Sequence, residues 1–255
     1  MDFIVAANTD VGFIRRNNQD SLSVKVVKTR QGRMVFAALC DGMGGLAKGE
    51  LASATVIRAF DDWLMKELPL LCENPLEDEV ISRRWENIVA EQNDLIKHYG
   101  MEHDVKLGTT AVIMLLSQEQ YYILNVGDSR AYEICDDVCQ ITEDHSYVAR
   151  EVAKGNMTWD EAKVHKKRNV LLQCIGAGRT VRPDIFVGKV KKNAVFMLCS
   201  DGFWHMITPE EMSQELNYAA MSNAGTIQHT LAELTDLCKQ RGETDNISVV
   251  LVKTV

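Results

Sequence analysis

The sequence lacks an excess of positive charge and any run apolar enough to cross a membrane. Its 28 basic residues are outnumbered by 36 acidic ones, which gives a formal net charge of −8 at pH 7. A protein that binds the nucleic-acid backbone needs a basic face, so we expect no nucleic-acid partner. No apolar stretch approaches the ~18–20 residues of a membrane span, so we also expect no membrane partner.

The cysteines do not indicate a disulfide scaffold or a zinc site. They number 7, an odd count, and the chain starts without the basic and apolar segments of a signal peptide. Cys40 and Cys199 end apolar runs and are expected to be reduced and buried. Cys135 and Cys139 predict a hairpin turn, because a zinc knuckle would need a second ligand pair. A reducing cytoplasm is the expected location.

No internal repeat, low-complexity segment or linker divides the sequence. Hydrophobic residues make up 46% and charged residues 25%, as in ordinary globular proteins. We therefore predict a single domain over residues 1–255.

Periodicity predicts helices and strands in alternating blocks. Two long helices are expected over Glu50–Leu68 and Val80–Tyr99. A third opens at Thr208 with a capping box and an N1 proline, and a fourth carries apolar residues from Ile227 to Cys238 on one side. The predicted strands are Ser21–Lys28, Met34–Cys40, Thr109–Leu116, Tyr121–Val126, Arg130–Cys135, Val138–Thr142, Asp184–Val190, Ala194–Cys199 and Ile247–Val252.

The connections between the strands of residues 109–142 are only a few residues long. Such links predict antiparallel hairpins rather than parallel crossovers. Residues 144–178 are instead polar, with one short helix opening at a capping box from Thr158 to Glu161. Two helix pairs separated by runs of hairpin strands form an α+β pattern.

Aspartates stand where strands begin or end. Asp41, Asp128 and Asp201 follow apolar strands, Asp245 precedes the last strand, and Asp20 precedes another. One such residue is an ordinary turn former, but repetition at several strand ends suggests that carboxylates gather around cations. Oxygen ligands favour Mg²⁺ or Mn²⁺ over zinc or copper, and the glycine after Asp41 would let a carbonyl approach a metal. Paired ions of this kind promote in-line displacement at phosphorus.

Several short motifs lie at residues 12–21, 41–45, 49–50, 107–110, 127–130, 144–146, 200–202 and 245–246. Together they resemble the metal-dependent (PPM, type 2C) serine/threonine protein phosphatase family, in a bacterial-type member. Each motif is weak alone, but their order matches the family over roughly residues 5–253. The resemblance implies a four-layer αββα sandwich of two antiparallel β-sheets flanked by helix pairs, with a flap at about residues 144–178.

The resemblance also implies an activity. It is the hydrolysis of phosphoserine and phosphothreonine in proteins by attack of a metal-bound water at a binuclear Mg²⁺ or Mn²⁺ centre, with a third, weaker ion possible. Asp41 resembles the aspartate that bridges both ions, and the carbonyl of Gly42 resembles a ligand of the second ion. Asp201 and Asp245 resemble the other direct ligands of the first ion.

The remaining site residues carry supporting roles in this family. Asp20 matches an acid that holds metal-bound water, and Asp128 matches a residue that helps Asp201 hold the third ion. Arg15 matches the arginine that grips the substrate phosphate, for which its planar fork of donors is suited. The implied partners are phosphorylated proteins made by a serine/threonine kinase, and a monomer is expected.

The sequence departs from the family pattern at several positions. Gln19 replaces a glutamate that contacts the second metal through water, so the affinity for that ion is expected to fall. Met43 stands where animal-type members have a histidine, as is common in bacterial-type members. Leu46 replaces a frequent histidine, and His205 replaces a frequent aspartate, which suggests an outlying subfamily.

The same residues give little support to other functions. No Gly-x-Ser-x-Gly elbow supports a nucleophilic triad, and no Gly-Lys-Ser/Thr follows the glycine-rich stretch to cradle a nucleotide. His145 and His165 favour structural roles over contact with a substrate. The basic residues from Lys163 to Arg168 are either a solvated face or an attraction for acidic substrates. The main alternative is a catalytically weak or silent signalling module that keeps the phosphatase fold.

Overall fold

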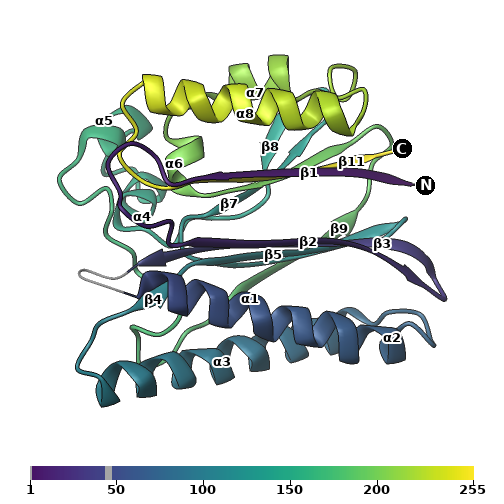
Figure 1. Cartoon of the computed structure of the whole chain (residues 1–255), viewed down its shortest axis with the longest axis horizontal. Helices are drawn as coiled ribbons and strands as arrows, with labels where there is room; N and C mark the ends of the chain where they lie inside the picture. Colours follow the sequence, from purple (N-terminus) through teal and green to yellow (C-terminus); the bar gives the residue numbers. More distant parts are fainter. Residues whose placement is uncertain (1, 44–47) are drawn as a thin grey trace.

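The computed structural model describes residues 2–43 and 48–255. Two antiparallel sheets lie face to face, and helices cover the outer face of each (Figure 1). One sheet has the strand order β1-β11-β10-β7-β8, and the other has the order β2-β3-β5-β6-β9, with β4 paired to β3. The predicted α+β sandwich is therefore confirmed.

The elements agree with most of the predicted ranges. The strands are β1 (Phe3–Asp10), β2 (Asp20–Thr29), β3 (Gly32–Met43), β4 (Gly108–Thr109), β5 (Ala111–Leu116), β6 (Gln120–Val126), β7 (Arg130–Ile134), β8 (Val138–Gln140), β9 (Asp184–Lys189), β10 (Val195–Cys199) and β11 (Ile247–Thr254). The helices are α1 (Gly49–Lys66), α2 (Leu68–Leu71), α3 (Asp78–Glu102), α4 (Tyr147–Ala153), α5 (Trp159–Val164), α6 (Asp201–Trp204), α7 (Pro209–Glu215) and α8 (Ala224–Gln240).

Hydrophobic residues form three cores, one in each space between successive layers. One lies between α1 and α3 and the adjoining sheet, a second lies between α7 and α8 and the other sheet, and the third fills the space between the sheets. Representative buried members are Phe36 and Trp85 in the first core, Leu231 in the second, and Ile123 and Phe196 in the third. A central strand such as β10 is buried on both faces, which explains its unbroken apolar sequence.

The capping boxes form as predicted. At the start of α5 the side chain of Thr158 accepts a hydrogen bond from the backbone N–H of Glu161. The Glu161 carboxylate in turn accepts one from the backbone N–H of Thr158. Thr208 and Glu211 make the same reciprocal bonds at the start of α7. Each cap satisfies backbone N–H groups that have no partner within the helix.

The structure corrects two predictions, one of extent and one of pairing. Strand β3 does not end at Cys40 but runs to Met43, because its last residues pair with β4. Strands β6 and β7 form no hairpin, since β6 pairs with β5 and β9 while β7 pairs with β8 and β10. The link at residues 127–129 crosses between the sheets instead. Packed sheets lie about 10 Å apart, a gap that three residues can span, so a short link does not by itself predict a hairpin.

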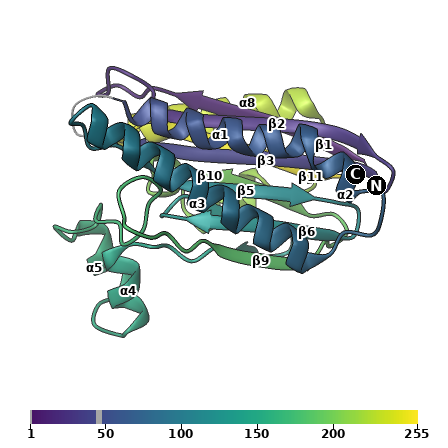
Figure 2. The same ribbon diagram turned by 90° about the horizontal axis from the view of Figure 1, so that it is seen from below.

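The sequence did not predict strand β1 or the short helices α2, α4 and α6. Strand β1 lies at the edge of its sheet, and most of its side chains are only partly buried, so its hydrophobic pattern is weak. Helix α4 lies with α5 in residues 144–178, which project beside the sandwich (Figure 2). In the described residues no helix is both long enough and apolar enough to span a bilayer. The single-domain organisation stays a prediction.

Candidate active site

The predicted site residues come from separate strand ends that meet at one end of the sandwich (Figure 1). Asp20 and Asp41 are direct partners in the β2–β3 ladder. Asp128 lies in the link between β6 and β7, and Asp201 begins α6 directly after β10. Asp245 lies just before β11.

The five aspartates are close enough to influence one another electrostatically. Burial raises the pKa of Asp41 well above its usual range, and the charges of Asp20, Asp201, Asp128 and Asp245 raise it further. Like charges held together in a low-dielectric region each favour the protonated form of the others. The sequence prediction that these residues lie together is therefore consistent with the structure.

Asp20, Asp128 and Asp201 show the same effect. Burial raises the pKa of Asp20 to about 6 and that of Asp128 to about 7. Burial also raises the pKa of Asp201 well above its usual range, with Asp128 as the next largest cause. Such shifts mark a place where a cation would stabilise ionised carboxylates.

Unpaired oxygens provide an independent sign of a cation site. Both carboxylate oxygens of Asp20 and Oδ1 of Asp201 are buried without a hydrogen bond of ordinary geometry. A buried polar atom without a partner is costly, and metal coordination would remove that cost. Among residues 2–43 and 48–255, however, no three acidic, histidine or cysteine side chains form a metal-binding group by themselves. Backbone oxygens and water would have to complete the ligand set, as Mg²⁺ commonly requires.

Buried hydroxyl groups hold the backbone beside Asp41. The Asp41 N–H donates to Oγ1 of Thr110 over 2.9 Å, and the Thr110 N–H donates to the Asp41 carbonyl over 2.8 Å. The Thr110 hydroxyl in turn lies 2.8 Å from the hydroxyl of Ser129, next to Asp128. These contacts connect two of the predicted metal ligands through side chains that are buried.

The backbone at Gly42 packs too closely for any side chain. A Cβ atom added there would lie 2.3 Å from the carbonyl oxygen of Gly49 and 2.5 Å from that of Gln19. A Cβ atom on Gly49 would likewise lie 2.6 Å from the Gly42 carbonyl oxygen. Glycine at both positions brings the start of α1 against β3 and leaves the Gly42 carbonyl unblocked by a side chain.

The side chain of Gln19 lies beside Glu50, an acid outside the aspartate cluster. Its side-chain amide donates to Oε2 of Glu50 over 3.3 Å, and its backbone N–H donates to Oδ1 of Asn246 over 2.8 Å. Glu50 therefore supplies a carboxylate near the position where the family usually has one. Glu50 belongs to the motif at residues 49–50, but the sequence did not predict its contact with Gln19.

Arg15 lies at the edge of the acidic cluster. Its Nη2 atom donates to Oδ2 of Asp245 over 2.6 Å, and its side chain is 50% exposed. This bond raises the pKa of Arg15, and the charges of Asp41 and Asp201 act in the same direction. A cation that is half exposed beside a buried acidic cluster is placed to meet an incoming anion.

Arg130 is a positioning residue that sequence reasoning did not single out. It makes a bidentate ion pair with Asp144, at 2.9 Å from Nε and 2.7 Å from Nη2. Its guanidinium carbon also lies 3.3 Å from the ring centre of Trp204, whose indole N–H donates to the Asp128 carbonyl over 2.9 Å. The signal in the sequence is a charged residue at the start of a buried strand, since such residues are seldom buried without a partner.

Residues 144–178 are connected to the site through that pair. Arg130 lies 5.6 Å from the ring centre of Trp159 in α5, and Asp144 begins the segment. His145 has a structural role: its Nε2 atom lies 2.9 Å from Oδ2 of Asp184, and its Nδ1 atom accepts a bond from Gly127 over 3.2 Å. Mobility of this segment as a flap stays a prediction.

The positions that depart from the family pattern have different surroundings. Met43 is the last residue of β3, and Leu46 lies outside the described residues. His205 makes an edge-on contact with Trp204, with ring centres 4.1 Å apart, and its side chain is 26% exposed. Burial lowers the pKa of His205 to about 4, with the charge of Arg130 as the next cause, so this side chain is neutral near pH 7.

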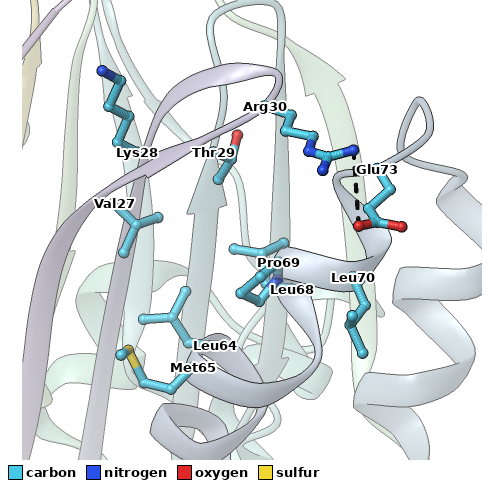
Figure 3. A pocket seen from close by; sticks show the side chains of 10 residues that line it. All are labelled: Val27, Lys28, Thr29, Arg30, Leu64, Met65, Leu68, Pro69, Leu70 and Glu73. Atoms are coloured by element: carbon cyan, nitrogen blue, oxygen red, sulfur yellow. Dashed lines mark ion pairs between the residues drawn. The ribbon is translucent and has the colours of Figure 1, made fainter.

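A surface pocket elsewhere does not fit the predicted chemistry. It has a volume of about 670 Å³ and lies around the β2–β3 turn, α2 and the end of α1 (Figure 3). Its lining is mainly apolar, and Glu73, its acidic residue, faces Arg30 at 3.8 Å. It lies at the opposite end of the sandwich from the aspartates.

Comparisons with known proteins agree with this fold. The serine/threonine phosphatase stp of Listeria innocua serovar 6a is 32% identical over 252 residues, covering 96% of this chain and 93% of the relative. The serine/threonine phosphatase Stp1 from Staphylococcus aureus superposes with a TM-score of 0.85 at 29% identity, over 100% of this chain and 96% of that one. The catalytic domain of the phosphatase PstP, crystallised with two manganese ions, has a TM-score of 0.78 at 28% identity, over 100% of both chains.

The family assignment follows from the extent of these matches. The model of the family described as "Protein phosphatase 2C" matches residues 15–237, a span that includes Arg15, Asp41 and Asp201. Asp245 lies beyond the matched residues but within the structural superpositions, which cover the whole chain. The chain belongs to the protein phosphatase 2C family.

Proposed function

We propose that this chain removes phosphate from phosphoserine and phosphothreonine in proteins, with Mg²⁺ or Mn²⁺ as its cofactor. The observation that carries the proposal is a cluster of buried and partly buried aspartates, in which carboxylate oxygens of Asp20 and Asp201 lack partners, bordered by the half-exposed Arg15. The names of the relatives and the two manganese ions of the PstP structure support it. The substrates would be products of a serine/threonine kinase in the cytoplasm, and we expect the enzyme to act as a monomer.

The proposed ligands divide between two principal ions. Asp41 would contact both ions, and the Gly42 carbonyl would contact the second. Asp201 and Asp245 would complete the first site, while Asp20 would hold coordinated water. Asp128 would join Asp201 at a third, weaker site. When bound, paired ions of this kind activate a water for in-line attack and neutralise the leaving oxygen.

The chain itself supplies substrate orientation. Arg15 would donate to the phosphate through its fork of N–H groups, a geometry that matches two phosphate oxygens. Its bond to Asp245 holds the guanidinium at the edge of the cluster before a substrate arrives. The buried hydroxyls around Thr110 fix the backbone of Asp41, so little reorganisation is needed during the reaction.

The direct test is metal-dependent phosphate release from a phosphothreonine peptide. The wild-type protein should release phosphate with Mn²⁺ and should stop when a chelator removes the ion. An Asp41→Asn variant provides the control for contaminating phosphatases. If the wild-type and variant proteins release phosphate equally, the proposed function is wrong.

We predict that no phosphoenzyme forms during turnover. Cys40 and Cys199 are buried, and burial raises the pKa of both thiols, so neither is available as a thiolate nucleophile. The hydroxyl of Ser200 is also buried and accepts a bond from the Ser248 N–H over 3.0 Å. Acid quenching during turnover of a ³²P-labelled phosphopeptide should leave the protein unlabelled. A stoichiometric protein-bound label would contradict direct hydrolysis.

We predict that Gln19→Glu lowers the Mn²⁺ concentration needed for half-maximal activity. A carboxylate at this position would orient water and offset cationic charge, whereas an amide only orients water. Changes around metal ligands typically alter affinity by about 10–100-fold. The measurement is phosphate release over a Mn²⁺ titration, with circular dichroism to confirm an unchanged fold.

The size of this effect depends on Glu50, because its carboxylate already lies beside the Gln19 amide. A Glu50→Gln variant is the matched comparison and should raise the Mn²⁺ requirement. If Gln19→Glu has no effect while Glu50→Gln does, Glu50 alone supplies the charge at this site. A wild-type protein that is inactive at millimolar Mn²⁺ but active as Gln19→Glu would instead identify the silent signalling module.

A further inference from the structure

Two large apolar side chains are presented to solvent beside Arg15. Phe13 is 73% exposed and Ile14 is 67% exposed, in the turn between β1 and β2. Single exposed apolar residues are common on protein surfaces. These two are adjacent in sequence and lie at the end of the sandwich that carries the aspartates (Figure 1). We call Phe13 and Ile14 the apolar turn.

The backbone around the apolar turn is firmly attached to the site. The side-chain amide of Asn246 donates to the carbonyl of Val11 over 2.9 Å and to that of Asn17 over 3.2 Å, so it joins both ends of the turn. A Cβ atom on Gly12 would lie 2.6 Å from the carbonyl oxygen of Asp245. The turn therefore packs directly against a predicted metal ligand.

The lysine that lies beside Phe13 is already neutralised within the protein. Lys239 lies 5.4 Å from the ring centre of Phe13, but its ammonium contacts Asp10 at 2.8 Å and Asp236 at 2.7 Å. An acidic partner would have to compete with two carboxylates for this lysine. The exposed side chains of Phe13 and Ile14 are themselves hydrocarbon, which favours an apolar occupant.

The spacing along the chain relates the turn to the phosphate position. Ile14 precedes Arg15 directly and Phe13 lies one residue further, and each residue spans at most about 3.5 Å. A substrate peptide in an extended conformation also spans about 3.5 Å per residue. When Arg15 holds the phosphate, the turn can meet a side chain one or two positions from the phosphorylated residue.

We propose that the apolar turn binds an apolar side chain of the substrate, one or two positions from the phosphoserine or phosphothreonine. This inference rests on the proposed function, because it takes Arg15 as the residue that receives the phosphate. Phe13 and Ile14 are thus specificity-determining residues that select phosphorylated segments with a neighbouring leucine, isoleucine, valine or aromatic residue.

The test compares kcat/KM for matched phosphothreonine peptides. One set carries leucine one or two positions before or after the phosphothreonine, and the reference carries serine at all of these positions. The wild-type protein should prefer a leucine peptide by about 5- to 20-fold, as expected for partial burial of one such side chain. A Phe13→Ser/Ile14→Ser double variant should reduce this ratio to nearly one.

A Leu70→Ser variant is the matched control. Leu70 is 67% exposed, like Ile14, but it lies in α2 at the opposite end of the sandwich. This variant should keep the wild-type ratio. If the double variant misfolds by circular dichroism, the single variants Phe13→Ser and Ile14→Ser replace it, and each should lower the ratio.

Either of two kinetic results would overturn the proposal. One is a wild-type ratio near one at every peptide position, and the other is a wild-type ratio that persists in the variants. A wild-type dimer that the double variant abolishes, measured by sedimentation, would assign the turn to self-association and would also overturn it.

Failure of the proposed function has a different signature. In that case no peptide would release phosphate. Binding of the same peptides, carrying a fluorescent label, would then be measured by fluorescence anisotropy. The leucine preference should still appear in the dissociation constants, and equal constants for the leucine and serine peptides would overturn the inference.

Discussion

An Asp41→Asn variant is expected to lose phosphatase activity at any attainable Mn²⁺ concentration. Asp41 is the acid whose pKa responds to all four of the other clustered aspartates, after burial itself. Removing its charge would weaken both principal ions together. Because metal ions supply several kcal/mol of transition-state stabilisation, we expect a loss of about 10³-fold or more in kcat/KM.

The same substitution should not destabilise the metal-free protein. Asparagine removes a buried charge that its neighbours repel, while the backbone bonds of residue 41 to Thr110 are unaffected. The melting temperature without metal should therefore be equal to or higher than that of the wild type. The rise in melting temperature that Mn²⁺ produces in the wild type should disappear. Retained activity, or a metal-free protein that unfolds more easily, would contradict the assignment of Asp41.

An Arg15→Ala variant is expected to lose phosphate recognition but not metal binding. Loss of one charge-assisted contact to the transition state costs about 2–4 kcal/mol, or roughly 30- to 1,000-fold in kcat/KM. Metal affinity should be equal or higher, because Asp245 is released from its bond with the arginine. Steady-state kinetics on a phosphopeptide and calorimetric titration with Mn²⁺ measure the two effects separately.

Arg16 provides the matched control for this variant. It is the next residue along the chain and is also exposed, so Arg16→Ala removes the same charge at nearly the same place. Only Arg15→Ala should lower kcat/KM strongly, and Arg15→Lys should fall between the two because it keeps the charge without the planar fork. Equal kinetics for all three variants would mean that Arg15 is an ordinary surface residue.

Local sequence predicted most elements of the fold. The capping boxes at Thr158 and Thr208 form as expected, because the groups that make them lie within four residues of one another. The unbroken apolar run of β10 was also recognisable, since a strand buried on both faces needs apolar residues throughout. The edge strand β1 was missed because its partly buried side chains leave no such pattern.

The candidate site was predictable in composition but not in geometry. Aspartates at strand ends and their order along the chain indicated the residues of the cluster. The link from Val126 to Arg130 was misinterpreted as a hairpin, because a short connection suits either a hairpin or a crossing between sheets. The ion pair of Arg130 with Asp144 and its contact with Trp204 depend on that crossing. No local pattern could have predicted them.

The sequence by itself determined which residues are available for chemistry and where the helices and most strands form. These properties depend on periodicity, capping and motif order, all of which are local. The tertiary structure decided which strand ends meet, that Asp20 lies opposite Asp41, and that Arg15 reaches Asp245. It also decided that Phe13 and Ile14 stay exposed, since burial depends on what packs against a residue after the chain has folded.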